Sequence, residues 1–239
     1  MHKRLSKPRF LFVYPLAVLL FAVGRITERN LRLGILLIVL GELVRLWANG
    51  YVGHVKVNWT EQSRGDAKIG RLITGGPYAF VRHPLYFGTA VIGAGFCLIV
   101  GSVWLALPSF AGFLLIYRAK MAEEERTLLN EWDSAYQRYH RAVPRLMPWR
   151  PRYPDRHGRW SWKGVAASKE WKTAIWVTVV VILLYFWEEA VQKREPLFQG
   201  RWVKHACLLA LLVVLIATDG VVELVKRRSR RRATTGAGH

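Results

Sequence analysis

The chain has few cysteines for its length, and it lacks the short motifs that define many soluble enzymes. Only 2 of its 239 residues are cysteine, Cys97 and Cys207, and both lie within apolar runs. No Cys-x-x-Cys pair and no His/Cys set with metal-ligand spacing is present, so neither a disulfide framework nor a metal site is predicted. The glycine patterns of nucleotide-binding loops and the Gly-x-Ser-x-Gly motif are also missing, which argues against the enzyme classes built on them.

Acidic residues are also few. There are 16 Asp and Glu against 36 Lys and Arg, which gives a formal charge of +20, yet 52% of the residues are hydrophobic. Apolar runs alternate with basic stretches; they cover residues 10–24, 31–48, 85–101, 103–117, 171–187 and 206–225. Because runs of this kind are close to the ~20 residues of a helical span, the sequence predicts an all-α, polytopic integral-membrane bundle of about six transmembrane helices.

The distribution of basic residues predicts an orientation in the membrane. Most Lys and Arg fall in residues 1–9, 49–84, 118–172 and 226–239, and positive residues concentrate on the cytoplasmic side. We therefore expect the N-terminus, a small helical cap after the fourth helix and the C-terminal tail to be cytoplasmic. A cleaved signal peptide is the alternative for the first apolar run, because basic residues precede it.

Two basic segments flank the last pair of apolar runs. Residues 149–172 combine Trp with Arg and Lys, a mixture that suits the lipid headgroup layer. The tail, residues 226–239, follows an apolar helix directly and is expected to be disordered. A basic cluster beside a membrane helix indicates binding to anionic lipids, and nucleic acid is not an expected partner.

A polar cluster precedes the third apolar run, within residues 76–88. Pro84 disfavours a helical conformation for the residue before it and suits a first helical position. The pattern therefore predicts a helix that begins at Pro84, with His83 just outside it and Tyr78 and Tyr86 nearby. Free N–H groups at this helix end could bind an anion. Taken alone, an Arg-His pair before a membrane helix is also typical of an interfacial anchor.

A second cluster, Glu123-Glu124-Glu125, follows the fourth run on a strongly patterned helix. Apolar residues follow it at steps of four, four and three, which mark one helical face: Leu128, Trp132, Tyr136 and Tyr139. Glu124 stands four residues before Leu128, so it extends this face, and Glu125 does the same for Leu129. The alternative is an acidic first turn favoured by the helix dipole, without a catalytic role.

Together these motifs resemble a known family. The order Gly-Pro-Tyr-x-x-x-Arg-His-Pro-x-Tyr-x-Gly, Glu-Glu-x-x-Leu, Tyr-x-x-Tyr and Val-Pro-Arg-x-x-Pro is similar to the isoprenylcysteine carboxyl methyltransferase family. That family belongs to a broader group that includes phospholipid N-methyltransferases. The resemblance covers residues 70–148 of a membrane core, residues 1–148. It leaves unexplained the basic, Trp-rich segment 149–172 and an additional membrane hairpin, residues 173–225.

The resemblance implies methyl transfer from S-adenosylmethionine to a lipophilic or lipidated acceptor that enters from the membrane. By motif match, the residues implied to line the cofactor are Leu72, Tyr78, His83, Pro84, Leu85 and Tyr86, with Glu124 on the opposite side and Glu125 beside it. A glutamate suits the cofactor's ammonium group, and an Arg, a His or helix N–H groups suit its carboxylate.

This chain departs from the family at two places. Trp132-Asp133 stands where the family often has Phe-Gly, and Lys120 stands where the carboxyl methyltransferases have a substrate-binding Arg. Lys can neutralise a carboxylate but lacks the bidentate fork of Arg. We therefore expect Lys120 or the nearby Arg118 to orient an anionic or polar substrate head.

Several functions remain open at this point. A phospholipid or amine N-methyltransferase and a thiol S-methyltransferase would share the cofactor site and differ in the acceptor. A membrane sterol-type reductase has a similar Arg-His-Pro-x-Tyr motif but binds a nicotinamide cofactor, and the glutamate pair argues against it. A membrane scaffold that retains an inactive core is the non-enzyme alternative.

Overall fold

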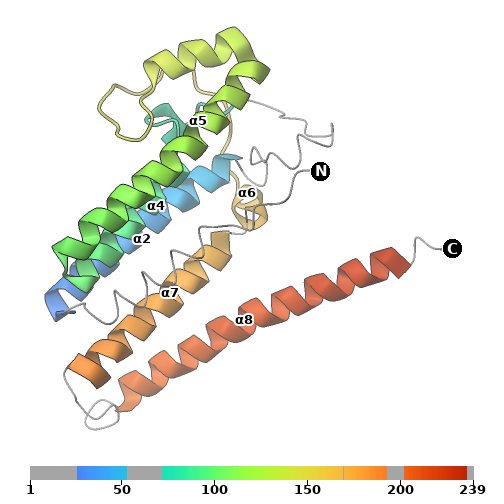
Figure 1. Cartoon of the computed structure of the whole chain (residues 1–239). Coiled ribbons are helices and arrows are strands. Elements are labelled where there is room, and N and C mark those ends of the chain that lie inside the picture. The colour runs from blue at the N-terminus through green and yellow to red at the C-terminus, as the bar shows by residue number, and fades with distance from the viewer. Residues whose placement is uncertain (1–25, 53–71, 169, 193–201, 236–239) are drawn as a thin grey trace, which may run out of the picture. The chain divides into compact units, whose positions relative to one another are not determined.

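A computed structural model describes residues 26–52, 72–168, 170–192 and 202–235 of the chain. All regular elements in these ranges are helices, so the predicted all-α class is confirmed for this part of the chain. They are α2 (Glu28–Val52), η1 (Gly76–Ala79), α4 (Pro84–Val100), α5 (Val103–Ala142), α6 (Trp162–Ala167), α7 (Glu170–Trp187), η2 (Glu188–Gln192) and α8 (Trp202–Thr235). The chain divides into two compact units, residues 1–170 and 171–239 (Figure 1).

The number of membrane spans differs from the expected six. Among the described residues, two helical stretches are long and apolar enough to cross a membrane, Trp171–Val191 and Trp202–Val222, and Pro84–Val100 is a shorter apolar helix. The first expected span, residues 10–24, lies outside the described residues. Six spans are therefore not confirmed: α2 and α5 mix their apolar residues with charged ones, and a multi-pass bundle remains a prediction from the sequence.

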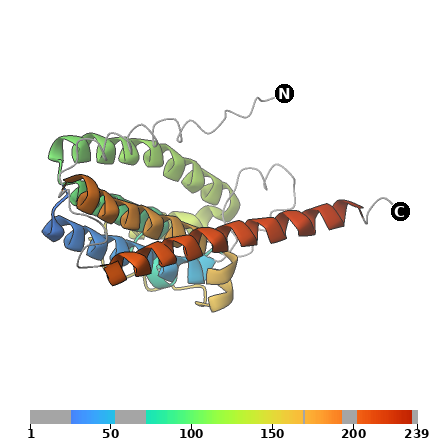
Figure 2. The same ribbon diagram turned by 90° about the horizontal axis from the view of Figure 1, so that it is seen from below.

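Helices α2 and α4 lie side by side in both views of the first unit (Figures 1 and 2). Their contact is built on two reciprocal glycine pairs. A Cβ added to Gly34 would lie 2.6 Å from the Gly95 carbonyl oxygen, and one added to Gly41 would lie 2.7 Å from the Gly88 oxygen. Small residues at such positions let two helix backbones approach closely, a packing mode that is common between membrane helices.

The Gly101-Ser102 junction between the third and fourth apolar runs leaves no room for a long loop, and the structure has a tight hairpin there. Helix α4 ends at Gly101, which has φ 69° and donates its N–H to the carbonyls of Cys97 and Leu98. Glycine suits this left-handed position because it has no side chain to clash. Ser102 then leads directly into α5.

Helix α5 joins the fourth apolar run, residues 103–117, to the patterned helix that carries the glutamate cluster. It runs for 40 residues from the apolar hairpin into the predicted cap, and its backbone breaks helical geometry at Asp133, with φ 33° and ψ −113°. Figure 1 shows the part beyond this kink lying across the end of the unit. Asp133 stands at the position where the family that the motifs resemble often has glycine.

The basic segment after α5 folds back onto the first unit. Thr74 and Gly75 donate backbone hydrogen bonds of 3.1 and 2.9 Å to the His157 carbonyl, and the Tyr153 N–H bonds the Ala79 carbonyl at 2.9 Å. Short helix α6 then packs against the C-terminal end of α2, where the Ser161 N–H donates to the Gly50 carbonyl. Residues 149–168 are thus part of the fold, beyond the interfacial role predicted for them.

The second unit contains α7, the π-helical turn η2 and α8. Lys172 on α7 pairs with Asp219 on α8 at 3.1 Å, and the Tyr185 hydroxyl lies 3.1 Å from His205 Nε2. Many apolar side chains of α8 are exposed, among them Val213 and Val214, which fits a helix that faces lipid. Helix α8 extends to Thr235 and so includes most of the basic stretch that was expected to be a disordered tail.

Candidate functional site

The start of α4 has the geometry that its proline predicts. His83 is the residue before the helix, with φ −124° and ψ 64°, and α4 begins at Pro84. Two backbone hydrogen bonds fix this entry: the Arg82 N–H donates to the Pro144 carbonyl at 2.9 Å, and the His83 N–H donates to the Arg145 carbonyl at 3.1 Å. The Val-Pro-Arg motif therefore holds the Arg-His-Pro motif in place through the backbone.

Glu125 on α5 is the centre of a buried ion-pair network, and only 4% of this residue is exposed. Its carboxylate is 3.0 Å from His83 Nε2, 3.3 Å from Arg82 Nε and 3.1 Å from Arg145 Nε, and it also accepts a bond from Arg145 Nη2. The two Arg–Glu contacts made by Arg145 form the bidentate arrangement that planar guanidinium groups favour. Glu125 thus links the cap part of α5 to the Arg-His-Pro motif and to the Val-Pro-Arg motif.

The protonation state of Glu125 follows from these partners. Burial alone would raise its pKa, but hydrogen bonds from His83 and Arg145 and the positive charge of Arg82 outweigh burial and lower the pKa to about 2. Glu125 is therefore ionised at neutral pH, and its charge is taken up by protein groups.

Glu124 has a different environment, although it is the adjacent residue. Its carboxylate accepts a 2.5 Å hydrogen bond from the Tyr86 hydroxyl and lies 3.7 Å from His83 Nδ1. The Glu124 side chain is 25% exposed, against 5% for Glu125. Within the described part of the chain no guanidinium group contacts Glu124, so of the two carboxylates it is the one open to a ligand.

Aromatic rings extend from this pair along α5. The Tyr117 ring packs 5.0 Å from the Tyr86 ring, and Phe113 packs 4.3 Å from Tyr117. Lys120 Nζ lies 5.7 Å from the Tyr86 ring centre. The Tyr86–Glu124 pair therefore lies between an apolar, aromatic helix face and a cation, which suits a ligand with a polar head and an apolar body.

The other predicted cofactor residues surround this region in different ways. Tyr78 accepts a 2.7 Å hydrogen bond at its carbonyl from the Tyr139 hydroxyl. Leu72 packs against the cluster formed by Tyr136, Tyr139 and Val143. Pro84 is fully buried, whereas Leu85 is half-buried with its carbonyl near Arg45. Arg118 is exposed, and of the two predicted substrate-orienting residues only Lys120 has a recorded contact with Tyr86.

Sequence reasoning missed the partners of Glu125. Both arginines belong to the motifs, and an interfacial anchor is the alternative interpretation for Arg82. Neither Arg82 nor Arg145 is assigned a contact with Glu125 from the sequence, yet both contact this carboxylate. Their presence in the quoted motifs was the available signal, because a buried acid on the predicted face requires positive partners. Within the described ranges, no group of three or more His, Cys, Asp or Glu residues could hold a metal ion.

In the described ranges the protein combines apolar helices with a polar site where the α4–α5 hairpin begins. This combination is typical of a membrane enzyme. Comparison with known proteins indicates the class of enzyme. Residues 30–133 match the family model for phospholipid methyltransferases, a family that includes isoprenylcysteine carboxyl methyltransferases. The resemblance predicted from the motifs is therefore confirmed, and a membrane methyltransferase is the class that the match indicates.

A curated relative matches more distantly. The cobalt-zinc-cadmium resistance protein CzcN of Cupriavidus metallidurans is 28% identical over 150 residues, which are 61% of this chain and 63% of the relative. This chain thus spans less than two thirds of that protein's length. No solved structure matches the chain.

Proposed function

We propose that this protein transfers a methyl group from S-adenosylmethionine to a lipophilic acceptor at the membrane. The observation that carries the proposal is the contrast between the two adjacent glutamates. Glu125 is neutralised by Arg82, Arg145 and His83, while the partly exposed Glu124 is held by the Tyr86 hydroxyl.

The residues at this site fit the chemistry of S-adenosylmethionine. The exposed carboxylate of Glu124 suits an ammonium group. The faces of Tyr86 and Tyr117 suit a sulfonium, because aromatic rings attract cations. When bound, this donor supplies an activated methyl group, so the protein's own residues have to orient the reactants and exclude water. The buried Glu125 network supports this role by fixing the helix that carries Glu124.

The preferred acceptor is a carboxylate on a lipidated compound, as in isoprenylcysteine carboxyl O-methylation. A carboxylate is nucleophilic without a general base, and Lys120, beside Tyr86, supplies a positive charge that orients it. The match to the phospholipid methyltransferase model favours an amine of a phospholipid as the second candidate. A thiol is the third, and a nicotinamide-dependent reductase or an inactive scaffold are the more remote ones.

The acceptor classes are separated by one transfer assay. The full chain, reconstituted in liposomes, is incubated with methyl-labelled S-adenosylmethionine and, in parallel, with a farnesylated cysteine, phosphatidylethanolamine and a long-chain thiol. A methyl ester releases labelled methanol in base, whereas N- and S-methyl products retain the label. Base-labile label on the farnesylated cysteine is expected, reduced in Lys120→Gln and unchanged in the control Lys163→Gln. Base-stable label alone would replace the carboxylate with the amine or the thiol.

A further inference from the structure

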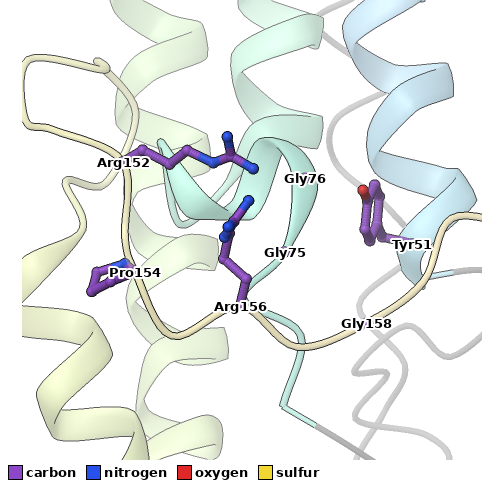
Figure 3. Close-up of a pocket in the computed structure, with 7 residues that line it drawn as sticks. All are labelled: Tyr51, Gly75, Gly76, Arg152, Pro154, Arg156 and Gly158. Carbon is purple, nitrogen blue, oxygen red and sulfur yellow. The ribbon is translucent and has the colours of Figure 1, made fainter.

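A polar cavity lies in the first unit, and its described lining residues differ from those proposed above to bind the methyl donor. It has a volume of about 320 Å³. Arg152 and Arg156 line it from the segment after α5, residues 152–159, which we call the strap. Its other lining residues include Gly75 and Gly76 at the start of η1, and Tyr51 from α2. Figure 3 shows the two guanidinium groups extending from the strap toward the same space. The strap residues lie beyond residue 133, where the family match ends.

Two glycines and the hydrogen bonds of Thr74 define the shape of the cavity. Gly76 has φ 60°, and a Cβ on it would lie 2.2 Å from the Tyr51 ring, so only glycine allows this approach. Gly158 has φ 109°, and a Cβ on it would lie 3.2 Å from the Ile73 side chain and 3.4 Å from the Tyr51 ring. Thr74 ties the strap down, since its hydroxyl donates to the Asp155 carbonyl at 2.8 Å and accepts from the His157 N–H at 2.9 Å. The cavity therefore belongs to the hydrogen-bonded fold.

Charge in the cavity is strongly positive. Among the described residues that line it, two are arginines and none is acidic. The nearest acid in the strap sequence, Asp155, pairs with His157 at 2.8 Å. Arg152 is positioned by the Phe80 ring, whose centre lies 5.9 Å from its Cζ, and stacking of this kind leaves the N–H groups of a guanidinium free for an anion.

We propose that this cavity binds a phosphate group. Two guanidinium groups that face one space form a positively charged site, and phosphate offers several acceptor oxygens to their planar N–H forks. The phosphate can come from a lipid headgroup or from a soluble phosphate compound. Trp149 and Trp162, on the same segment, are 70% and 69% exposed, and such indoles favour the headgroup layer. The proposal does not rest on methyl transfer.

Calorimetric titration of the detergent-purified full chain tests the proposal. Inorganic phosphate is one ligand and short-chain phosphatidic acid the other, with short-chain phosphatidylcholine for comparison. Saturable binding of either phosphate ligand is expected, weakened at least about tenfold in Arg152→Gln/Arg156→Gln, because the double variant removes both charged hydrogen-bond donors. Arg159→Gln, an exposed residue of the same strap that does not line the cavity, should bind as the native chain does.

The outcomes separate the two sources and the competing explanation. Binding of inorganic phosphate indicates a soluble phosphate compound, and binding of phosphatidic acid alone indicates a lipid headgroup. Because Arg152 also packs on Phe80, Arg156→Gln alone provides a variant that leaves this packing intact. Absence of binding by both phosphate ligands, or equal loss in Arg159→Gln, would overturn the proposal. Loss of S-adenosylmethionine binding in Arg156→Gln, without any phosphate binding by the native chain, would assign the cavity to the methyl donor.

Discussion

Tyr86, in the first turn of α4, donates a 2.5 Å hydrogen bond to Glu124 on α5. This bond joins the two motifs of the candidate site across the helical hairpin. Among the described residues, Glu124 also lies 3.7 Å from His83 Nδ1, whereas Glu125 contacts two arginines. The Tyr86 hydroxyl is therefore the closest group that orients the Glu124 carboxylate.

Replacing Tyr86 with Phe removes that hydroxyl and retains the ring. We expect S-adenosylmethionine to bind about tenfold more weakly, because a hydrogen bond to a charged group contributes ~1.5–3 kcal/mol, while the melting temperature changes little. Calorimetry and thermal denaturation measure the two effects. Tyr117→Phe is the matched control, since its ring packs against Tyr86 at 5.0 Å. Equal losses in the two variants would mean that the Tyr86 hydroxyl has no special role.

Glu125 should control the acid stability of the first unit. Its pKa in the folded protein, about 2, lies below the ordinary value of 4.5. Its ionised form therefore stabilises the fold at pH values above about 4.5, and this contribution is lost as the pH falls toward 2. We expect Glu125→Gln to destabilise the protein at pH 7 by ~3–5 kcal/mol, because Arg82 and Arg145 lose their buried partner. Denaturation between pH 3 and 7 should show a flatter pH dependence in the variant; an unchanged slope would contradict the assigned ion pairs.

Asp133 should be replaceable by glycine with a gain in stability. Its φ of 33° with ψ −113° is unfavourable for a residue with a side chain. We expect Asp133→Gly to stabilise the protein by about 1 kcal/mol in chemical denaturation, although it removes a 3.3 Å hydrogen bond from Gln137. Asp133→Ala keeps a Cβ and should show no gain. If both variants lose stability equally, the kink is not a strained position.

The glycine contact between α2 and α4 can be tested within a single helix. A Cβ at Gly95 would lie 2.7 Å from the Gly34 carbonyl oxygen, whereas a Cβ at Gly93 would meet nothing within 4 Å. We expect Gly95→Ala to destabilise the protein by ~1–3 kcal/mol through overpacking. Gly93→Ala should be neutral or stabilising by up to ~1 kcal/mol. Similar effects of the two changes would rule out close backbone packing at Gly95.

Local rules were sufficient to predict several parts of the site. Pro84 sets the start of α4, because proline restricts its own φ and the conformation of His83. The steps of four and three from Glu124 to Tyr139 predict one helical face, and Tyr136 and Tyr139 of this face are buried. Gly101 followed by Ser102 predicts the tight hairpin, which the Gly101 φ of 69° confirms.

Long-range pairings could not be predicted in the same way. The contacts of Glu125 with Arg82 and Arg145 join residues that are 43 and 20 positions apart, and no local period relates them. The strap is held by backbone hydrogen bonds and by the Thr74 hydroxyl, and neither kind of contact leaves a periodic pattern in the sequence. Helix α5 passes residue 117 without interruption because no breaker follows its apolar part, and the limits of an apolar run do not show that it and the patterned helix after it are one helix.

The central claim is that Glu124 belongs to a binding site for S-adenosylmethionine. The most direct measurement is calorimetric binding of this donor to the detergent-purified full chain, with a nicotinamide cofactor as the control ligand. The matched variants are Glu124→Gln and Glu123→Gln, because Glu123 is the exposed neighbour on the same helix. We predict binding by the native chain and by Glu123→Gln, and at least about tenfold weaker binding by Glu124→Gln. Absence of binding by the folded native chain, or equal affinity in all three proteins, would contradict the account.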